Sequence, residues 1–172
     1  MIFLGRLRAD VRAASWFAAL GEPLTQGDVA EAKAYANAGA VDFLKSWPEA
    51  ERFLKSSEAS LSWWDADETE RKALLASAEA RYPKRALWTS LTELTTEAGD
   101  LVHGKAATAA ARMGGAAPAS IHVAAGAAAQ AVYQLAVARV AGETASRFES
   151  KFRLFAAGRW PLGVVGSRLI LF

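Results

Sequence analysis

The chain of 172 residues contains no cysteine, and it has only two histidines and five prolines. The absence of cysteine excludes a disulfide framework, a thiolate metal site, an iron–sulfur cluster and a cysteine nucleophile. A chain of this length buries roughly 70% of the surface that its unfolded form exposes, which is enough to fold around one apolar core without cross-links. We therefore expect an intracellular, cytoplasmic protein with no cofactor.

The excess of one sign of charge over the other is also small, because the formal net charge is only +2. No run of five or more like charges occurs, although such runs mark the arms that bind nucleic acid. Residues 24–30 resemble the opening of a helix-turn-helix motif. The following residues 41–45 offer one base and one acid, however, where a recognition helix presents several groups to the DNA groove. We predict no nucleic-acid partner.

Long hydrophobic runs are missing as well. Only four apolar residues precede the first charged segment, whereas the core of a signal peptide needs about 7–15. The longest uncharged stretch, residues 113–138, contains glycine, proline, histidine and glutamine, and its apolar content is mostly alanine. A spanning helix needs about 20 strongly apolar residues. We therefore expect neither an export signal nor a membrane span.

Alanine is the residue that is present in excess, at 40 of the 172 positions. Alanine loses the least free energy on entering a helix, so most segments favour helix. Residues 119–141 are apolar almost all the way round, as in the central helix of a bundle. The sequence predicts an all-α fold in which residues 1–172 form a single helical domain of about six to eight helices around this alanine-rich helix.

The expected helix ends follow from capping and turn residues. Gly21 and Pro23 close a first helix that begins near Leu4, and a further helix begins at Asp65. Three more helices are expected to begin at the capping residues Thr25, Ser46 and Ser146. Residues 159–172 are expected to form an irregular or strand-like tail, with a turn at 160–163 and either a short strand or an apolar plug at 169–172. Residues 2–4 have a similar composition, which predicts a minor β pairing of the two termini.

Four polar residues on one helix are the first candidate site. Carboxylates and a histidine at helical spacing are the elements of a metal site in a bundle. At about 100° per residue, however, the acids lie about 120° from the leucine stripe, and the histidine lies nearly opposite the core. No second helix supplies a Glu-x-x-His pair. An exposed acidic face is therefore favoured over a metal site for Glu93, Glu97, Asp100 and His103.

A second candidate is the helical stripe of His122, Gly126, Ala129 and Tyr133. Small residues flanked by an imidazole and a phenol leave a groove that holds a small ligand, with His122 as base or donor. The alternative is that a neighbouring helix packs closely against Gly126 and Ala129, which is the commoner use of small residues. Gln130, together with Gln134 one turn later, predicts either a polar contact across helices or part of a pocket wall.

The six tryptophans form the third group of candidates. Trp63 and Trp64 are adjacent in the expected connection before the helix at Asp65, and Trp160 lies in the tail. Indoles outside regular helices either cover the core or contact a partner. No coherent catalytic set appears. The leading hypothesis is therefore a non-catalytic protein that acts through protein contacts, including homodimerisation. The alternatives are a small-molecule binder or enzyme at His122 and Tyr133, and the metal site.

Overall fold

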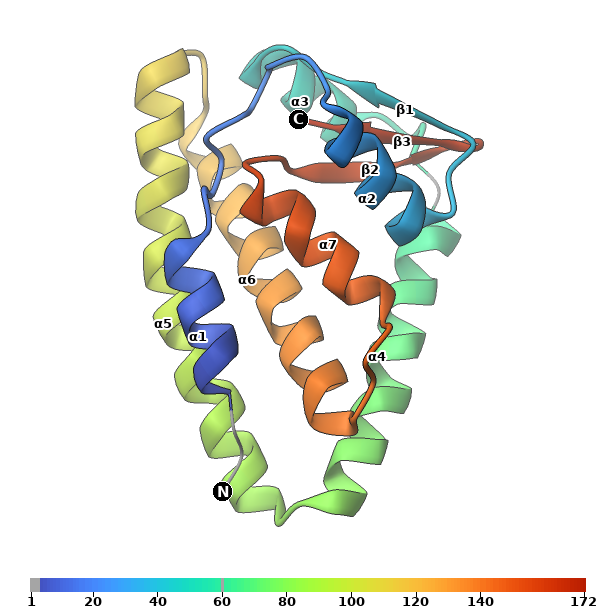
Figure 1. Cartoon of the computed structure of the whole chain (residues 1–172). Helices are drawn as coiled ribbons and strands as arrows, with labels where there is room; N and C mark the ends of the chain where they lie inside the picture. Colours follow the sequence, from blue (N-terminus) through green and yellow to red (C-terminus); the bar gives the residue numbers. More distant parts are fainter. Residues whose placement is uncertain (1–3, 60) are drawn as a thin grey trace.

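The computed structural model describes residues 4–59 and 61–172, and within them the chain forms seven helices and three short strands (Figure 1). The prediction of a mainly helical bundle with six to eight helices is confirmed. The helices are α1 (Gly5–Ala13), α2 (Gln26–Ala36), α3 (Trp47–Lys55), α4 (Leu61–Arg81), α5 (Lys84–Met113), α6 (Pro118–Ala141) and α7 (Arg147–Ala156). The strands are β1 (Ala40–Phe43), β2 (Pro161–Val165) and β3 (Arg168–Leu171).

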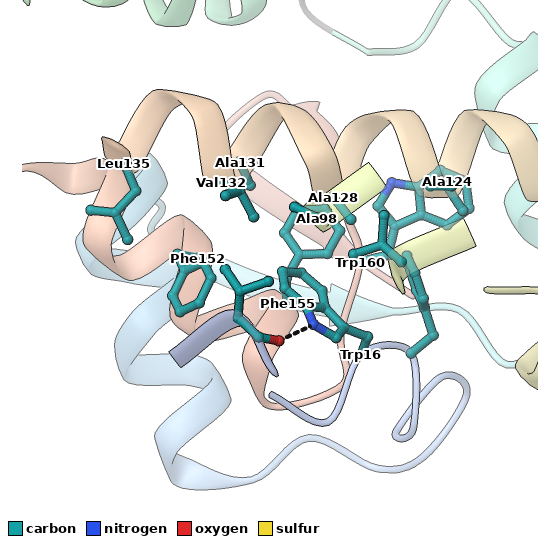
Figure 2. Close-up of a cluster of buried hydrophobic side chains, with 14 of the residues drawn as sticks. Trp16, Ala98, Ala124, Ala128, Ala131, Val132, Leu135, Phe152, Phe155 and Trp160 are labelled. Atoms are coloured by element: carbon teal, nitrogen blue, oxygen red, sulfur yellow. Dashed lines mark hydrogen bonds between the residues drawn. The ribbon is translucent and has the colours of Figure 1, made fainter. Parts of the chain in front are cut away.

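The predicted central helix is α6, which packs against α5, α4 and α7 (Figure 1). Its alanine side chains are short, so neighbouring helices approach it closely and large aromatic rings fit against it. Figure 2 shows alanines of α6 facing the rings of Phe155 and Trp160. Trp16 completes this part of the core. Its ring meets that of Phe152 edge-on, with centroids 5.7 Å apart, and its Nε1 donates to the carbonyl of Val11 at 2.8 Å.

The C-terminal residues form most of a small sheet with the strand order β1-β3-β2. β3 pairs parallel with β1 and antiparallel with β2. Of the strand and the apolar plug expected at residues 169–172, the strand is therefore confirmed. The turn expected at 160–163 is wrong, because β2 begins at Pro161 and the backbones of Trp160 and Phe172 extend the ladder by hydrogen bonds in both directions. Residues 2 and 3 of the expected terminal pairing lie outside the described residues.

Two expected helix boundaries also need correction. α1 ends at Ala13, because the following residues turn inward and bury Trp16, Phe17 and Leu20. Tertiary hydrogen bonds from this segment to residues 156 and 158 replace the helical ladder. α4 begins at Leu61 rather than at Asp65, so Trp63 and Trp64 belong to a helix and not to an extended connection.

The helix starts predicted from the capping residues Thr25, Ser46 and Ser146 are confirmed. Thr25 and Asp28 make both hydrogen bonds of a capping box at the start of α2. Ser46 and Ser146 accept from backbone N–H groups at the starts of α3 and α7. Such caps depend on residues close in sequence, so tertiary packing changes them little.

Within the described residues, α6 alone is long and apolar enough to cross a membrane, judged by length and composition. Of its most apolar window, 56% is buried inside the protein. The core helix of a water-soluble protein meets the same criterion, and the absence of a membrane span stays a prediction.

Candidate functional site

The stripe predicted on α6 opens onto a surface depression of about 490 Å³. Gly126, Ala129 and Tyr133 line it together with residues of α4 and α5. A Cβ atom added at Gly126 would meet no atom of a neighbouring element within 4 Å, so no helix closes over this position. His122 lies outside the depression, and its exposed ring is 4.9 Å from that of His103 on α5, between centroids.

The acidic set on α5 does not converge. Glu93 pairs with Arg8 at 3.3 Å and Glu97 pairs with Arg12 at 2.5 Å, so these carboxylates tie α1 to α5. Asp100 is exposed on the same helix. Within residues 4–59 and 61–172 there is no group of three or more His, Cys, Asp or Glu side chains that could hold a metal ion.

The three candidate tryptophans lie in different environments. Trp160 is only 2% exposed, and its ring packs against Trp47 and Phe172 inside the core. Trp63 is half-buried, with its ring centroid 5.2 Å from that of Tyr35. Trp64 lines a cavity between helices. Contacts within the chain therefore occupy much of the surface of all three rings.

That cavity, of about 240 Å³, is smaller and more enclosed than the surface depression beside Tyr133. It lies between α4, α6, α7 and the start of β2, and most of its wall is apolar. Glu68 and Gln130 line both this cavity and the surface depression, so the two hollows are adjacent. The lining residues are Trp64, Asp67, Glu68, Ala127, Gln130, Gln134, Lys151, Phe155 and Pro161.

The polar part of the wall is a buried ion pair. The Nζ atom of Lys151 donates to Oδ2 of Asp67 at 2.9 Å and to Oε1 of Gln134 at 2.9 Å. Lys151 is 5% exposed and Asp67 is 2% exposed. An ammonium group has three N–H donors, so these contacts leave one of them without a partner among the described residues. The Nε2 donor of Gln134 also has no partner within them.

Further groups surround Asp67. The hydroxyl of Tyr35 on α2 donates to its Oδ2 at 2.6 Å, and Nη2 of Arg147 lies 2.6 Å from its Oδ1. Arg147 also pairs with Glu70 on α4. Two carboxylates and two cations thus form one network of balanced formal charge that joins α2, α4 and α7.

Burial sets the protonation behaviour of this network. Burial lowers the pKa of Lys151 below its usual value, and the charge of Asp67 opposes this shift. The pKa of Tyr35 is raised well above its usual value by burial and by the negative charge of Asp67. Both shifts favour the uncharged forms, as expected for groups removed from water.

Lys151 and Asp67 are not among the residues predicted from the sequence, although the sequence holds one signal for Lys151. At about 100° per residue, Lys151 lies about 60° from Phe148 and about 40° from Phe155, so it falls on the aromatic stripe of its helix. A lysine on an apolar stripe predicts a buried amine. Gln134 is predicted as part of a pocket wall or as a cross-helix contact. In the structure it lines the cavity and also accepts a hydrogen bond from Lys151 on α7.

No protein-family model, curated protein or solved structure matches this chain. Its function is therefore inferred from the chemistry of the cavity and its walls.

Proposed function

We propose that this protein binds a small, largely apolar molecule with one neutral hydrogen-bond acceptor, such as a carbonyl group, in the cavity beside Lys151. The observation that carries the proposal is the buried ion pair of Lys151 and Asp67 in the cavity wall. Two N–H donors that have no partner in the described part of the chain, on Lys151 and Gln134, belong to residues that line the same space. A ligand with an acceptor group would satisfy them.

The buried charges themselves support a functional role. Removing two charges from water costs more than an apolar pair of the same size, so a buried ion pair is a weak means of stabilising a fold. Ionisable groups with shifted pKa values that line a hollow are more typical of functional sites. Because the charges of the network balance, a neutral acceptor suits the site better than a carboxylate, which Asp67 would repel.

The dimensions of the cavity define the ligand. An apolar cavity of about 150 Å³ holds benzene, so 240 Å³ accepts a ring with one small substituent. The rings of Trp64 and Phe155 and the methyl group of Ala127 would surround the apolar part. The adjacent depression beside Tyr133, where helical spacing predicts a groove, then serves as the entrance.

Protein contacts, the leading hypothesis from the sequence, have less support. Trp160 is inside the core. Among residues 4–59 and 61–172, the large apolar side chains that are exposed come from four different helices: Leu54, Leu61, Trp88 and Val123. Self-association stays a prediction, which sedimentation of the purified protein at several concentrations would test.

The binding proposal is tested with benzamide, which carries a carbonyl acceptor but forms no imine. Titration calorimetry and tryptophan fluorescence should both show saturable binding. Even at the low ligand efficiency of about 0.3 kcal/mol per non-hydrogen atom, its nine such atoms give a Kd of about 10 mM. Benzoate should bind more weakly than benzamide.

In the two matched variants, one alanine of α6 is replaced by leucine. Ala127→Leu places a larger side chain in the cavity and should weaken benzamide binding at least about tenfold. Ala119→Leu, at an exposed position on the same helix, should leave it unchanged. Absence of saturable benzamide binding to the wild-type protein, or equal binding by both variants, would refute the proposal.

A further inference from the structure

We infer that Lys151 forms a covalent imine with a small aldehyde or ketone held in the cavity, an inference that rests on the binding function proposed above. Lys151 lines the cavity, and its amine donates to Asp67 and Gln134, which line the cavity as well. A carbonyl ligand that accepts a hydrogen bond from Nζ already has its carbonyl carbon close to the nucleophile. The substrate class is thus an apolar carbonyl compound about as large as a substituted benzene ring.

The neighbouring carboxylate supplies the proton transfers that the reaction needs. Oδ2 of Asp67, 2.9 Å from Nζ, takes one proton from the ammonium group. The neutral amine then attacks the carbonyl carbon, and a second proton moves from nitrogen to the former carbonyl oxygen to give a carbinolamine. Asp67 returns its proton to that hydroxyl group, which leaves as water as the C=N bond forms. The balance is ammonium plus carbonyl compound giving a protonated imine and one water.

Charges and rings beside Lys151 stabilise this product. The Nζ atom lies 5.7 Å from the ring centroid of Trp64 and 5.4 Å from that of Tyr35, within the range of cation–π attraction. The protonated imine keeps the positive charge that these rings and Asp67 face. Tyr35 holds the carboxylate in place through its 2.6 Å hydrogen bond. The enclosed wall limits the access of water that would hydrolyse the imine.

Burial also prepares the amine for attack. The lowered pKa of Lys151 increases the fraction of neutral amine at a given pH, and only the neutral amine is a nucleophile. The other lysines of the chain, at positions 33, 45, 55, 72, 84 and 105, are exposed. They are therefore internal controls in the same molecule.

The test is reductive trapping of the wild-type protein with benzaldehyde and cyanoborohydride at neutral pH, followed by peptide mapping by mass spectrometry. We expect Lys151 to become benzylated at least about tenfold faster than each exposed lysine, because the cavity holds the aldehyde beside its amine and burial favours the neutral form of that amine. Excess benzamide, which competes for the cavity, should slow labelling of Lys151 alone. Labelling of Lys151 at the rate of the exposed lysines, or not at all, would overturn the inference.

Two variants separate reaction from binding. Ala127→Leu should prevent labelling of Lys151 and leave the exposed lysines labelled as before. Lys151→Arg keeps a positive charge beside Asp67 and should bind benzaldehyde without covalent trapping at this position. Benzamide binding without labelling of Lys151 would overturn the imine but leave the binding function intact. If benzamide does not bind and Lys151 is not labelled, both the imine and the binding function are overturned.

Discussion

Replacing Lys151 with methionine should lower the free energy of unfolding by about 3 kcal/mol. Removal of one partner from a buried ion pair costs about 3–5 kcal/mol, because the other charge stays buried without full compensation. Asp67 would keep its contacts with Arg147 and Tyr35, each at 2.6 Å, so the low end of this range applies. For a chain of this length, the loss corresponds to a decrease in Tm of about 6–12 °C.

Urea denaturation followed by circular dichroism measures this change. The matched control is Lys72→Met on α4, which removes an exposed lysine 3.6 Å from Glu68 and should cost less than about 0.5 kcal/mol. The double variant Lys151→Met with Asp67→Asn should lose about 1–2 kcal/mol less unfolding free energy than the two single variants lose together, because neither buried charge is then left without its partner. If Lys151→Met and Lys72→Met differed by less than about 0.5 kcal/mol, Lys151 would not be part of a buried network.

Three further predictions concern two glycines and one surface carboxylate. Gly126→Ala should stabilise the protein by about 0.5–1 kcal/mol in thermal or urea unfolding. Alanine has a higher helix propensity than glycine, and the added Cβ would have no atom of a neighbouring element within 4 Å. Gly158→Ala should destabilise it by more than about 1 kcal/mol, since φ is +95° and the Cβ would lie 2.5 Å from a backbone nitrogen; the opposite order would contradict the structure. The hydrogen bond from Arg71 lowers the pKa of Glu68 from 4.5 to about 2, so its stabilisation is complete above about pH 4.5 and is lost as the pH falls through 2. Because the Glu68 side chain is 41% exposed, Glu68→Gln should cost less than about 1 kcal/mol at pH 7, and the difference from wild type in unfolding should shrink steadily as the pH falls from about 4.5 through 2.

Local sequence determines most of the helices. Alanine content and apolar spacing predict α5 and α6, and the side chains of Thr25, Ser46 and Ser146 cap the following helices as expected. These features depend on interactions between residues a few positions apart, so they can be inferred without knowledge of the fold. Helix ends are harder to predict. α1 stops at Ala13 because Trp16 and Phe17 find partners on α7, which lies far along the chain.

The candidate site shows the same division. Its groove residues, Gly126, Ala129 and Tyr133, share one face of α6 and could be grouped by helical spacing alone. The enclosed cavity could not be predicted in this way, because Asp67 and Lys151 are separated by 84 positions and meet only when α4 and α7 pack against α6.

The sequence by itself determined that this protein is helical and that an alanine-rich helix lies at its centre, and it indicated that the C-terminal segment differs from the helices. Only the tertiary structure decided which strands that segment pairs with, which tryptophans are buried and which charges face each other. The physical reason is range. Propensity and capping act within a turn or two of helix, whereas burial of Lys151 against Asp67 requires the whole core to exclude water from both.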